Sequence, residues 1–503
     1  MSFVDPRIRL AADLYNLGLT RGLSDVGGNE VILTPGTRPL PFGTFDLETN
    51  PQEFDWAGFR MTRFIAVGEF EVRGLRNRYR QAGVGAPLAA ELTPTGEGPD
   101  AESKRGRIPP IIKVPVTAFV RIANIDKGIE TGNVTGRLEL YAADEASMVD
   151  VDGRRVPLEL EPTAALAYTL EGAAVWDTEI GNFLSPSNKV FGGDGLIMMH
   201  PYRPGQIPVV LIHGTTSSPA RWAEMLNELQ NDPILKDRVQ FWLFTYNTSN
   251  PILLSARDLR MALTKALQDF DPDGRDPALR DLVLIGHSQG DLLARLMVTD
   301  SENRFWNDVS NEPLSELKMS PDMRELLQTT VFFKSLPFVT RVVFISTPHK
   351  GSFRATGFVL DIVRRLVTFP VTMGKDLADT VAQNQAYVSP LARRGLRGMP
   401  TAVDNMSPNS AFAKTISASP IAPGVTVNSI VAVLGEGSLS SLTDGVVRYD
   451  SAHLAGIGTE KVVRSSHSTQ AEPDTIEEVR RILREQVAAF DRRDSPPGAA
   501  SSQ

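Results

Sequence analysis

The stretch Leu282-Val-Leu-Ile-Gly-His-Ser-Gln-Gly-Asp-Leu-Leu-Ala-Arg295 decides the fold of this 503-residue chain. A short apolar run ends in Gly286-His-Ser-Gln-Gly290, and apolar residues at helical spacing follow at once. This pattern predicts a strand, a sharp turn and a helix, with Ser288 on the turn. A serine on a strained turn needs neighbours without Cβ, because strand and helix must pack closely while Oγ points outward. The stretch is therefore typical of a nucleophile elbow.

Four further apolar, β-branched runs accompany this strand, and helical patterns alternate with them. They occupy residues 207–212, 239–244, 341–346 and 429–434. Helical patterns cover 218–229 and 252–270. This βα rhythm predicts an α/β fold, with a mainly parallel sheet that has helices on both faces. We assign this domain to residues 186–490.

Two connections in this domain are much longer than the usual few residues. They cover about 299–340 and 352–427, after the carboxyl ends of predicted strands. Insertions at such positions commonly build lids and substrate walls, so we predict lid or cap insertions there. A capping-box pattern at 474–477 predicts a last helix, and residues 491–503 are predicted to form a disordered tail.

The part of the chain before residue 186 has a different texture. Residues 1–55 begin with a helical pattern and continue with Pro- and Gly-rich sequence, which predicts an arm. Residues 56–185 contain short alternating apolar runs, which predict a β-sandwich-like accessory domain. The Pro-, Gly- and charge-rich segment 83–107 is predicted to be a long mobile loop. No catalytic cluster stands out in this β-rich part.

Composition excludes several classes of function. The net charge is −8 and no long Lys/Arg block occurs, which argues against nucleic acid as a partner. The chain has no cysteine, so disulfides, thiolate catalysis and Cys-based metal sites are excluded. No apolar run is long enough to span a membrane. For the compartment, which composition leaves undecided, we favour a secreted or periplasmic location, with a signal peptide removed, over the cytoplasm.

A serine hydroxyl is barely acidic and needs a base within hydrogen-bond reach. The chain has only six histidines. His287 adjoins the serine, and its side chain is expected to point away. His467 follows a short strand-like run just before the last helix, so its loop should cover the carboxyl edge of the sheet. We therefore predict His467 as the base, ahead of His453; the alternative is a surface loop histidine.

The base needs a carboxylate to hold its tautomer. Asp444 lies in an Asp-Gly turn after the 429–434 strand, and the order Ser288, Asp444, His467 is the one expected of an α/β-hydrolase sheet. An Asp in such a turn is also a common turn former. Asp404 and Asp450 are the fallback acids.

Attack on a carbonyl also needs donors for the oxyanion. The backbone N–H of Gln289, at the start of the elbow helix, is predicted as one donor. The loop His213-Gly-Thr-Thr-Ser217 follows an earlier strand, and Gly214 lets its backbone approach closely. We predict the N–H of Thr215 as the second donor.

Five ordered strings now make the chain similar to the α/β-hydrolase superfamily, and within it to bacterial esterases and lipases. These strings are Val210-Leu-Ile-His-Gly-Thr215, Gly286-His-Ser-Gln-Gly290, Ser346-Thr-Pro-His-Lys-Gly-Ser352, Asp444-Gly-Val-Val447 and the loop around His467. The resemblance covers about residues 200 to 490. It implies a serine hydrolase that cleaves carboxylic esters through an acyl-enzyme, without a metal or organic cofactor.

The resemblance leaves alternatives open. An acyltransferase would use the same triad, and a non-catalytic scaffold with this fold could bind a polymer or surface through its β-rich region. The expected partner is a small-molecule or lipid ester, with possible peripheral lipid contact; the sequence does not indicate an oligomeric state. One departure concerns Asp291, where such lipases usually have a second glycine. We predict that Asp291 turns sideways, accepts hydrogen bonds from backbone N–H groups or pairs with an Arg, and tunes activity without abolishing it.

Overall fold

The chain divides into two compact units. The first, the N-terminal unit, comprises Met1–Trp176 and Met198–Pro201, and the second, the C-terminal unit, comprises Asp177–Ile197 and Tyr202–Gln503. This computed structural model describes residues 5–24, 29–97, 105–171, 195–215, 217–352, 371–384, 386–388 and 402–494. None of the helices in these ranges combines the length and the apolar character that a membrane span requires.

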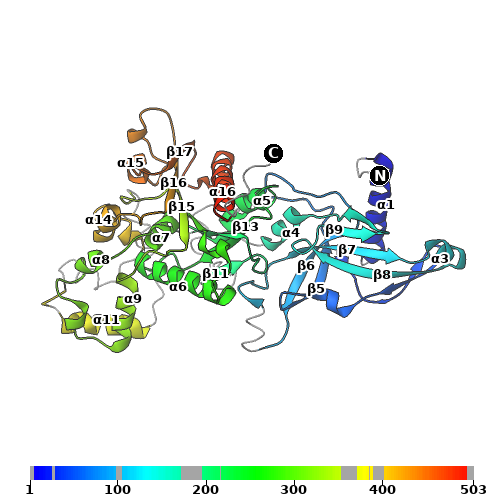
Figure 1. Ribbon diagram of the computed structural model, residues 1–503, viewed down its shortest axis with the longest axis horizontal. Coiled ribbons are helices and arrows are strands. Elements are labelled where there is room, and N and C mark those ends of the chain that lie inside the picture. Colours follow the sequence, from blue (N-terminus) through cyan, green and yellow to red (C-terminus); the bar gives the residue numbers. More distant parts are fainter. Residues whose placement is uncertain are drawn as a thin grey trace. The chain divides into compact units, whose positions relative to one another are not determined.

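One eight-stranded sheet dominates the N-terminal unit (Figure 1). The elements are α1 (Pro6–Leu23), β1 (Glu30–Val31), β2 (Gly36–Leu40), β3 (Gly43–Glu48), β4 (Asp55–Trp56), β5 (Phe59–Ala66), β6 (Ala86–Pro94), β7 (Val114–Ile122), α3 (Ile125–Thr131), β8 (Asn133–Ala142), β9 (Met148–Val151), β10 (Arg154–Pro157) and α4 (Pro162–Thr169). The strand order is β1-β5-β6-β7-β8-β3-β2, with β4 paired to β5, while β9 and β10 form a separate two-stranded sheet. The described residues of the N-terminal unit therefore contain one large sheet and a hairpin, in place of the predicted sandwich.

Residues 1–55 are not a separate arm, which corrects the predicted boundary. β1 pairs with β5 and β3 pairs with β8, so this segment supplies strands to the same sheet. The helix α1 is tied to it as well. The Tyr15 hydroxyl donates to the carbonyl of Val120, and Asn16 exchanges side-chain hydrogen bonds with Gly83 and Gly85. Long-range pairing of this kind leaves no local signature in a Pro- and Gly-rich sequence.

The prediction of a mobile loop at residues 83–107 is also wrong, because this segment contains β6. This strand is hydrogen-bonded on both sides, to β5 and to β7. Its residues Ala86 to Ala90 are all buried. A strand that is covered on both faces has no polar alternation, so the period-two pattern that identified its neighbours was missing here.

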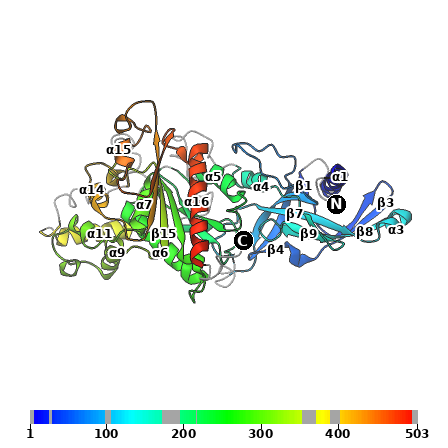
Figure 2. The same cartoon turned by 45° about the horizontal axis from the view of Figure 1, so that its top comes forward.

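A seven-stranded sheet forms the core of the C-terminal unit (Figures 1 and 2). The elements are β11 (Gly195–Met198), β12 (Ile207–Ile212), η4 (Pro219–Trp222), α5 (Ala223–Gln230), β13 (Val239–Thr245), α6 (Ile252–Phe270), β14 (Leu282–His287), α7 (Gln289–Met297), α8 (Arg304–Asn307), α9 (Pro321–Val331), β15 (Val339–Ile345), α11 (Val371–Gln383), α13 (Ala402–Asn405), α14 (Ala411–Ala418), β16 (Thr426–Val433), α15 (Tyr449–Ala452), β17 (Thr459–Arg464), η8 (Thr469–Ala471) and α16 (Pro473–Asp494).

The order β11-β13-β12-β14-β15-β16-β17 gives the sheet its topology. The pairs from β13 through β17 are all parallel. Every residue of β12, β13 and β14 is buried, because α5 and α16 pack on one face and α6 and α7 on the other (Figure 2). This arrangement confirms the predicted α/β class and brings the carboxyl ends of six parallel strands, β12 to β17, to one edge.

Both predicted insertions contain helices. The first holds α8 and α9, and the second holds α11, α13 and α14. Residues 353–370 and 389–401 of the second insertion lie outside the described residues, so the lid remains a prediction.

The start of the predicted tail, residues 491–494, belongs to α16. Asp491 pairs with Arg238, and Arg493 donates to Asp281 at 2.5 Å, so tertiary contacts extend this helix. Residues 495–503 lie outside the described ranges.

Candidate active site

Ser288 lies on a sharp turn between β14 and α7. Its backbone has φ 56° and ψ −117°, a region that residues with a Cβ rarely adopt. The two elbow glycines explain how the turn fits. A Cβ on Gly290 would lie 2.3 Å from the carbonyl oxygen of Ile212, and a Cβ on Gly286 would lie 2.4 Å from Asp291 Oδ1. The strand and helix therefore approach as closely as the sequence predicted.

His467 and Asp444 come from later loops to the same edge. His467 follows β17, and its Nε2 lies 2.9 Å from Ser288 Oγ. Its Nδ1 lies 2.6 Å from Asp444 Oδ2, on the loop after β16. The three predicted residues thus form a continuous hydrogen-bonded chain, in which each imidazole nitrogen has one partner.

Asp444 is held by its own turn. Its Oδ1 accepts hydrogen bonds from the backbone N–H groups of Val446 and Val447, at 2.8 and 2.7 Å. The other oxygen, Oδ2, bonds His467. The turn-forming role and the role as partner of the histidine are therefore combined in one carboxylate, with one oxygen for each.

The loop after β12 packs against the elbow. A Cβ on Gly214 would lie 3.0 Å from the Ser288 Cβ, so only glycine allows this approach without displacement. The hydroxyl of Thr215 donates to Gln289 Oε1 at 2.6 Å, and Gln289 Nε2 donates to the carbonyl of Thr248 at 3.2 Å. The N–H of Gln289 is in the first turn of α7, where a helix offers no carbonyl partner. Thr215 and Gln289 are thus adjacent, and their N–H groups stay the predicted oxyanion donors.

The alternative base and acids do not join this chain. His453 Nδ1 lies 2.8 Å from Glu460 Oε2, and its ring stacks on Tyr449. Because His467 Nδ1 already has Asp444 as its partner, the fallback acids Asp404 and Asp450 are not needed. The structure therefore distinguishes candidates that sequence order alone had left open.

His287 was expected to point away, and this expectation is wrong. Its ring centroid lies 5.0 Å from that of His467, and its Nε2 lies 2.9 Å from the backbone carbonyl oxygen of His467. Burial, and to a smaller extent the neighbouring His467, lowers the pKa of His287 to about 3. Sequence reasoning missed this contact because it depends on a loop 180 residues later in the chain.

Asp291 turns sideways, as predicted. Its Oδ2 accepts from the backbone N–H of Ile345 at 2.8 Å and from the Thr347 hydroxyl at 2.5 Å. Complete burial raises the pKa of Asp291 well above its ordinary value, and these two donors oppose the increase. The carboxyl group therefore fastens the first turn of α7 to the end of β15.

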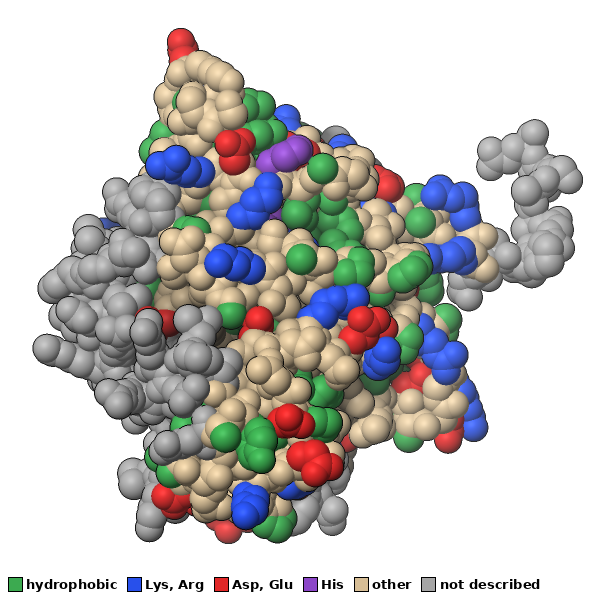
Figure 3. Space-filling model, turned by 90° about the vertical axis from the view of Figure 1, so that its left-hand side faces the viewer, with side chains coloured by type: hydrophobic (Ala, Val, Ile, Leu, Met, Phe, Trp, Pro, Cys, Tyr) green, Lys and Arg blue, Asp and Glu red, His purple; other side chains and the backbone are tan. Residues whose placement is uncertain are grey.

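On the face drawn in Figure 3, acidic and basic side chains are interspersed with hydrophobic ones. Within the described part of the chain, no group of three or more His, Asp or Glu side chains could hold a metal ion.

Comparisons with known proteins return similar folds at low identity. No protein-family model and no curated protein matches the chain. The mature form of the Bacillus licheniformis lipase BlEst2 is 16% identical, with a TM-score of 0.33, and the match covers 58% of this chain and 99% of that one. The metagenomic carboxyl esterase MGS0156 is 14% identical, with a TM-score of 0.32 and coverages of 58% and 78%.

A third similar structure is YbtT, a type II thioesterase from the yersiniabactin biosynthetic pathway, at 14% identity, TM-score 0.28 and coverages of 59% and 99%. At these values the similarities carry no argument about activity. The assignment of the fold rests on the chain's own topology. With its strand order, its parallel pairing and its serine turn after β14, the C-terminal unit has an α/β-hydrolase fold.

Proposed function

We propose that the chain is a serine hydrolase that cleaves carboxylic esters through an acyl-enzyme on Ser288. One observation carries the proposal: Ser288, His467 and Asp444 form a hydrogen-bonded chain with distances of 2.9 and 2.6 Å. The geometry is that of a nucleophile, a general base and a carboxylate that orients the base. The strained backbone of Ser288 supports it as well, because strain of this kind concentrates at functional sites.

In the proposed reaction, Ser288 Oγ attacks the ester carbonyl while His467 Nε2 accepts the hydroxyl proton. The C–O bond to the leaving alcohol then breaks, and His467 returns the proton to the alcohol. A water molecule attacks the acyl-enzyme with the same base, which releases the acid and restores Ser288. The backbone N–H groups of Thr215 and Gln289 would bind the oxyanion of each tetrahedral intermediate.

Covalent labelling tests the proposal directly. A fluorophosphonate should label the wild-type protein at Ser288 and should leave Ser288→Ala unlabelled. With p-nitrophenyl esters, Ser288→Ala should lose about 10⁴-fold or more in kcat, with an unchanged melting temperature. If the folded wild-type protein is not labelled, the hydrolase proposal is wrong and the scaffold alternative stands.

Product analysis separates hydrolysis from acyl transfer. A transferase would form the same acyl-enzyme but pass the acyl group to an alcohol or amine. With a labelled ester in water, free acid should form at the rate of ester consumption. If acid appears only slowly and an added alcohol captures the acyl group instead, transfer is the correct reaction.

A further inference from the structure

His287 lies between the two loops on which the proposed reaction depends. Its Nε2 is 2.9 Å from the carbonyl oxygen of His467. A carbonyl oxygen only accepts, so the imidazole must carry its hydrogen on Nε2 and donate it. On its other side, a Cβ on Gly214 would come within 3.0 Å of His287 Nδ1. The ring therefore fills the space between the loop after β12 and the loop after β17.

The backbone of His467 belongs to no helix or strand. It lies in the irregular segment between β17, which ends at Arg464, and the short helix η8. The carbonyl oxygen of His467 also accepts from the N–H of Thr469, a contact within the same loop. The N–H of Ser465, two residues earlier, donates to the carbonyl of Val433 at the end of β16. The hydrogen bond from His287 differs from both, because it joins the carbonyl of His467 itself to the last residue of a fully buried central strand. This hydrogen bond thus ties the position of the His467 backbone to the end of β14.

The same strand end also sets the position of Ser288. His287 closes β14, and the N–H of Ser288 donates to the carbonyl of Ile345 in the next strand. Because the two residues are adjacent, a contact from His287 fixes His467 relative to the serine itself. Burial lowers the pKa of His287 to about 3, so near neutral pH its ring gives a hydrogen bond without placing a charge beside the imidazolium that forms on His467.

We propose that His287 is a positioning residue, which holds the backbone of His467 so that Nε2 of the base stays within reach of Ser288 Oγ. The proposal rests on the proposed hydrolase function. Reacting groups tolerate little displacement, since a shift of about 1 Å can cost about 100-fold in rate. The contact should thus affect acylation and leave substrate binding nearly unchanged.

Three substitutions separate the hydrogen bond from the volume of the ring. His287→Gln offers an N–H near the position of Nε2. His287→Asn offers one nearer Nδ1, and His287→Phe keeps a ring without a donor. We expect His287→Asn and His287→Phe to lower kcat and the fluorophosphonate labelling rate by about 10- to 100-fold, with KM within about twofold. His287→Gln should recover most of the loss.

Melting temperature and circular dichroism identify which variants are folded. If folded His287→Asn labels as fast as His287→Gln and the wild type, the hydrogen bond does not position His467, and the inference is overturned while the hydrolase proposal stands. Loss of the melting transition in all three variants would assign the ring to packing and also overturn it. If the wild type itself is not labelled, the failure is that of the proposed function.

Discussion

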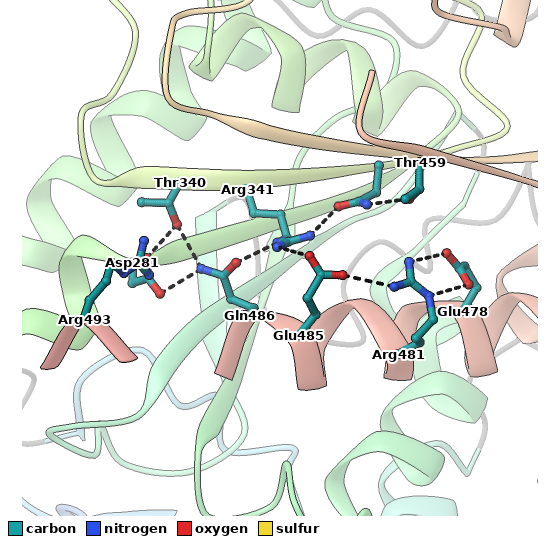
Figure 4. A network of polar contacts seen from close by, with 10 residues as sticks. Asp281, Thr340, Arg341, Thr459, Glu478, Arg481, Glu485, Gln486 and Arg493 are labelled. Carbon is teal, nitrogen blue, oxygen red and sulfur yellow. Dashed lines mark hydrogen bonds and ion pairs between the residues drawn. The ribbon is translucent and has the colours of Figure 1, made fainter. Parts of the chain in front are cut away.

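A buried polar cluster lies at each end of the parallel strands in the C-terminal sheet, one at the carboxyl edge and one at the amino edge. The two clusters are built in opposite ways. At the carboxyl edge, Ser288 has a strained backbone and its hydroxyl faces His467, which arrives on a loop. At the amino edge, Arg341 of β15 is at the centre of a network that joins the strand starts to α16 (Figure 4). One cluster concentrates strain on a reactive group, and the other distributes hydrogen bonds among elements.

In the Arg341 network, each of the three guanidinium nitrogens donates a hydrogen bond to a side chain. Nε donates to Gln486 at 2.6 Å, Nη1 to Asn428 at 2.7 Å, and Nη2 to Glu485 at 3.1 Å. Gln486 in turn donates to Asp281 at 2.8 Å (Figure 4). Because the Arg341 side chain is only 4% exposed, any lost partner leaves a buried group without a hydrogen bond.

This difference implies that the amino edge contributes to stability alone, whereas the carboxyl edge also determines activity. Buried groups that all have partners hold elements together, whereas strain is stored where a group must react. Substitutions at the amino edge should therefore change the free energy of unfolding and leave the chemistry intact. Those at the carboxyl edge should change the rate of labelling.

The largest effect on stability is expected from Arg341→Met. This change keeps much of the apolar stem but removes all three donor nitrogens. The side-chain oxygens of Asn428 and Gln486 then lose the hydrogen bonds that they accept from Arg341. We expect the free energy of unfolding to fall by about 3 kcal/mol. Chemical denaturation measures it, and the fluorophosphonate labelling rate of Ser288 should stay within about twofold under native conditions.

Arg481→Met is the matched control for Arg341→Met. Arg481 belongs to α16 and pairs with Glu478 and Glu485, but its side chain is 45% exposed (Figure 4). Solvent screens such pairs, so the control should cost less than about 1 kcal/mol. Equal destabilisation by the two substitutions would contradict a special role for the buried guanidinium.

A smaller loss of stability, with a clear loss of activity, is expected from Gly290→Ala. The added Cβ would lie 2.3 Å from the carbonyl oxygen of Ile212, which is backbone and must move. We expect a cost of about 2 kcal/mol and a labelling rate at least about tenfold lower, because the elbow shifts with the helix.

Gly18→Ala in α1 is the control for this substitution. Among the described residues, nothing beyond its chain neighbours and the backbone of α1 lies within 4 Å of a Cβ built there, so alanine should stabilise the helix by about 0.5 to 1 kcal/mol. Both free energies come from denaturant titrations. Normal labelling of Gly290→Ala would show that the elbow tolerates the displacement.

Local chemistry made the elbow and the mainly parallel sheet predictable. Gly286, Ser288 and Gly290 are needed by the turn itself, and each strand from β12 to β16 contains an apolar run. The structure also brings Asp444 and His467 to Ser288, because parallel strands deliver their following loops to one edge. The prediction worked where a residue's position follows from its own strand.

Contacts between distant segments were not predictable in the same way. β6 was missed because its residues are buried on both faces, and the arm was missed because β1 and β3 pair with strands far along the chain. The direction of His287 depends on where the His467 loop closes. Such features follow from packing between segments, which a periodic pattern does not record.

The last expected effect is a pH dependence of stability that originates at Asp291. Burial raises the pKa of Asp291 in the folded chain well above the ordinary value of 3.8. Below pH 3.8 both states keep the proton, and its stabilising contribution is complete. As pH rises, the unfolded chain releases the proton while the folded chain retains it, so the contribution decreases until the folded pKa is passed.

Asp291→Asn removes this titration and keeps a similar shape. Relative to the wild type, the variant should therefore gain stability as pH rises above about 4, by at most about 1.4 kcal/mol per pH unit. Denaturant titrations of both proteins from pH 4 to 8 measure the difference. A difference that is flat, or that favours the wild type as pH rises, would mean that Asp291 is ionised in the fold. A carboxylate charge would then lie one helical turn from Ser288. In that case Asp291→Asn should raise kcat/KM on a p-nitrophenyl ester. If Asp291 is neutral in the fold, the same substitution should change kcat/KM by less than about tenfold.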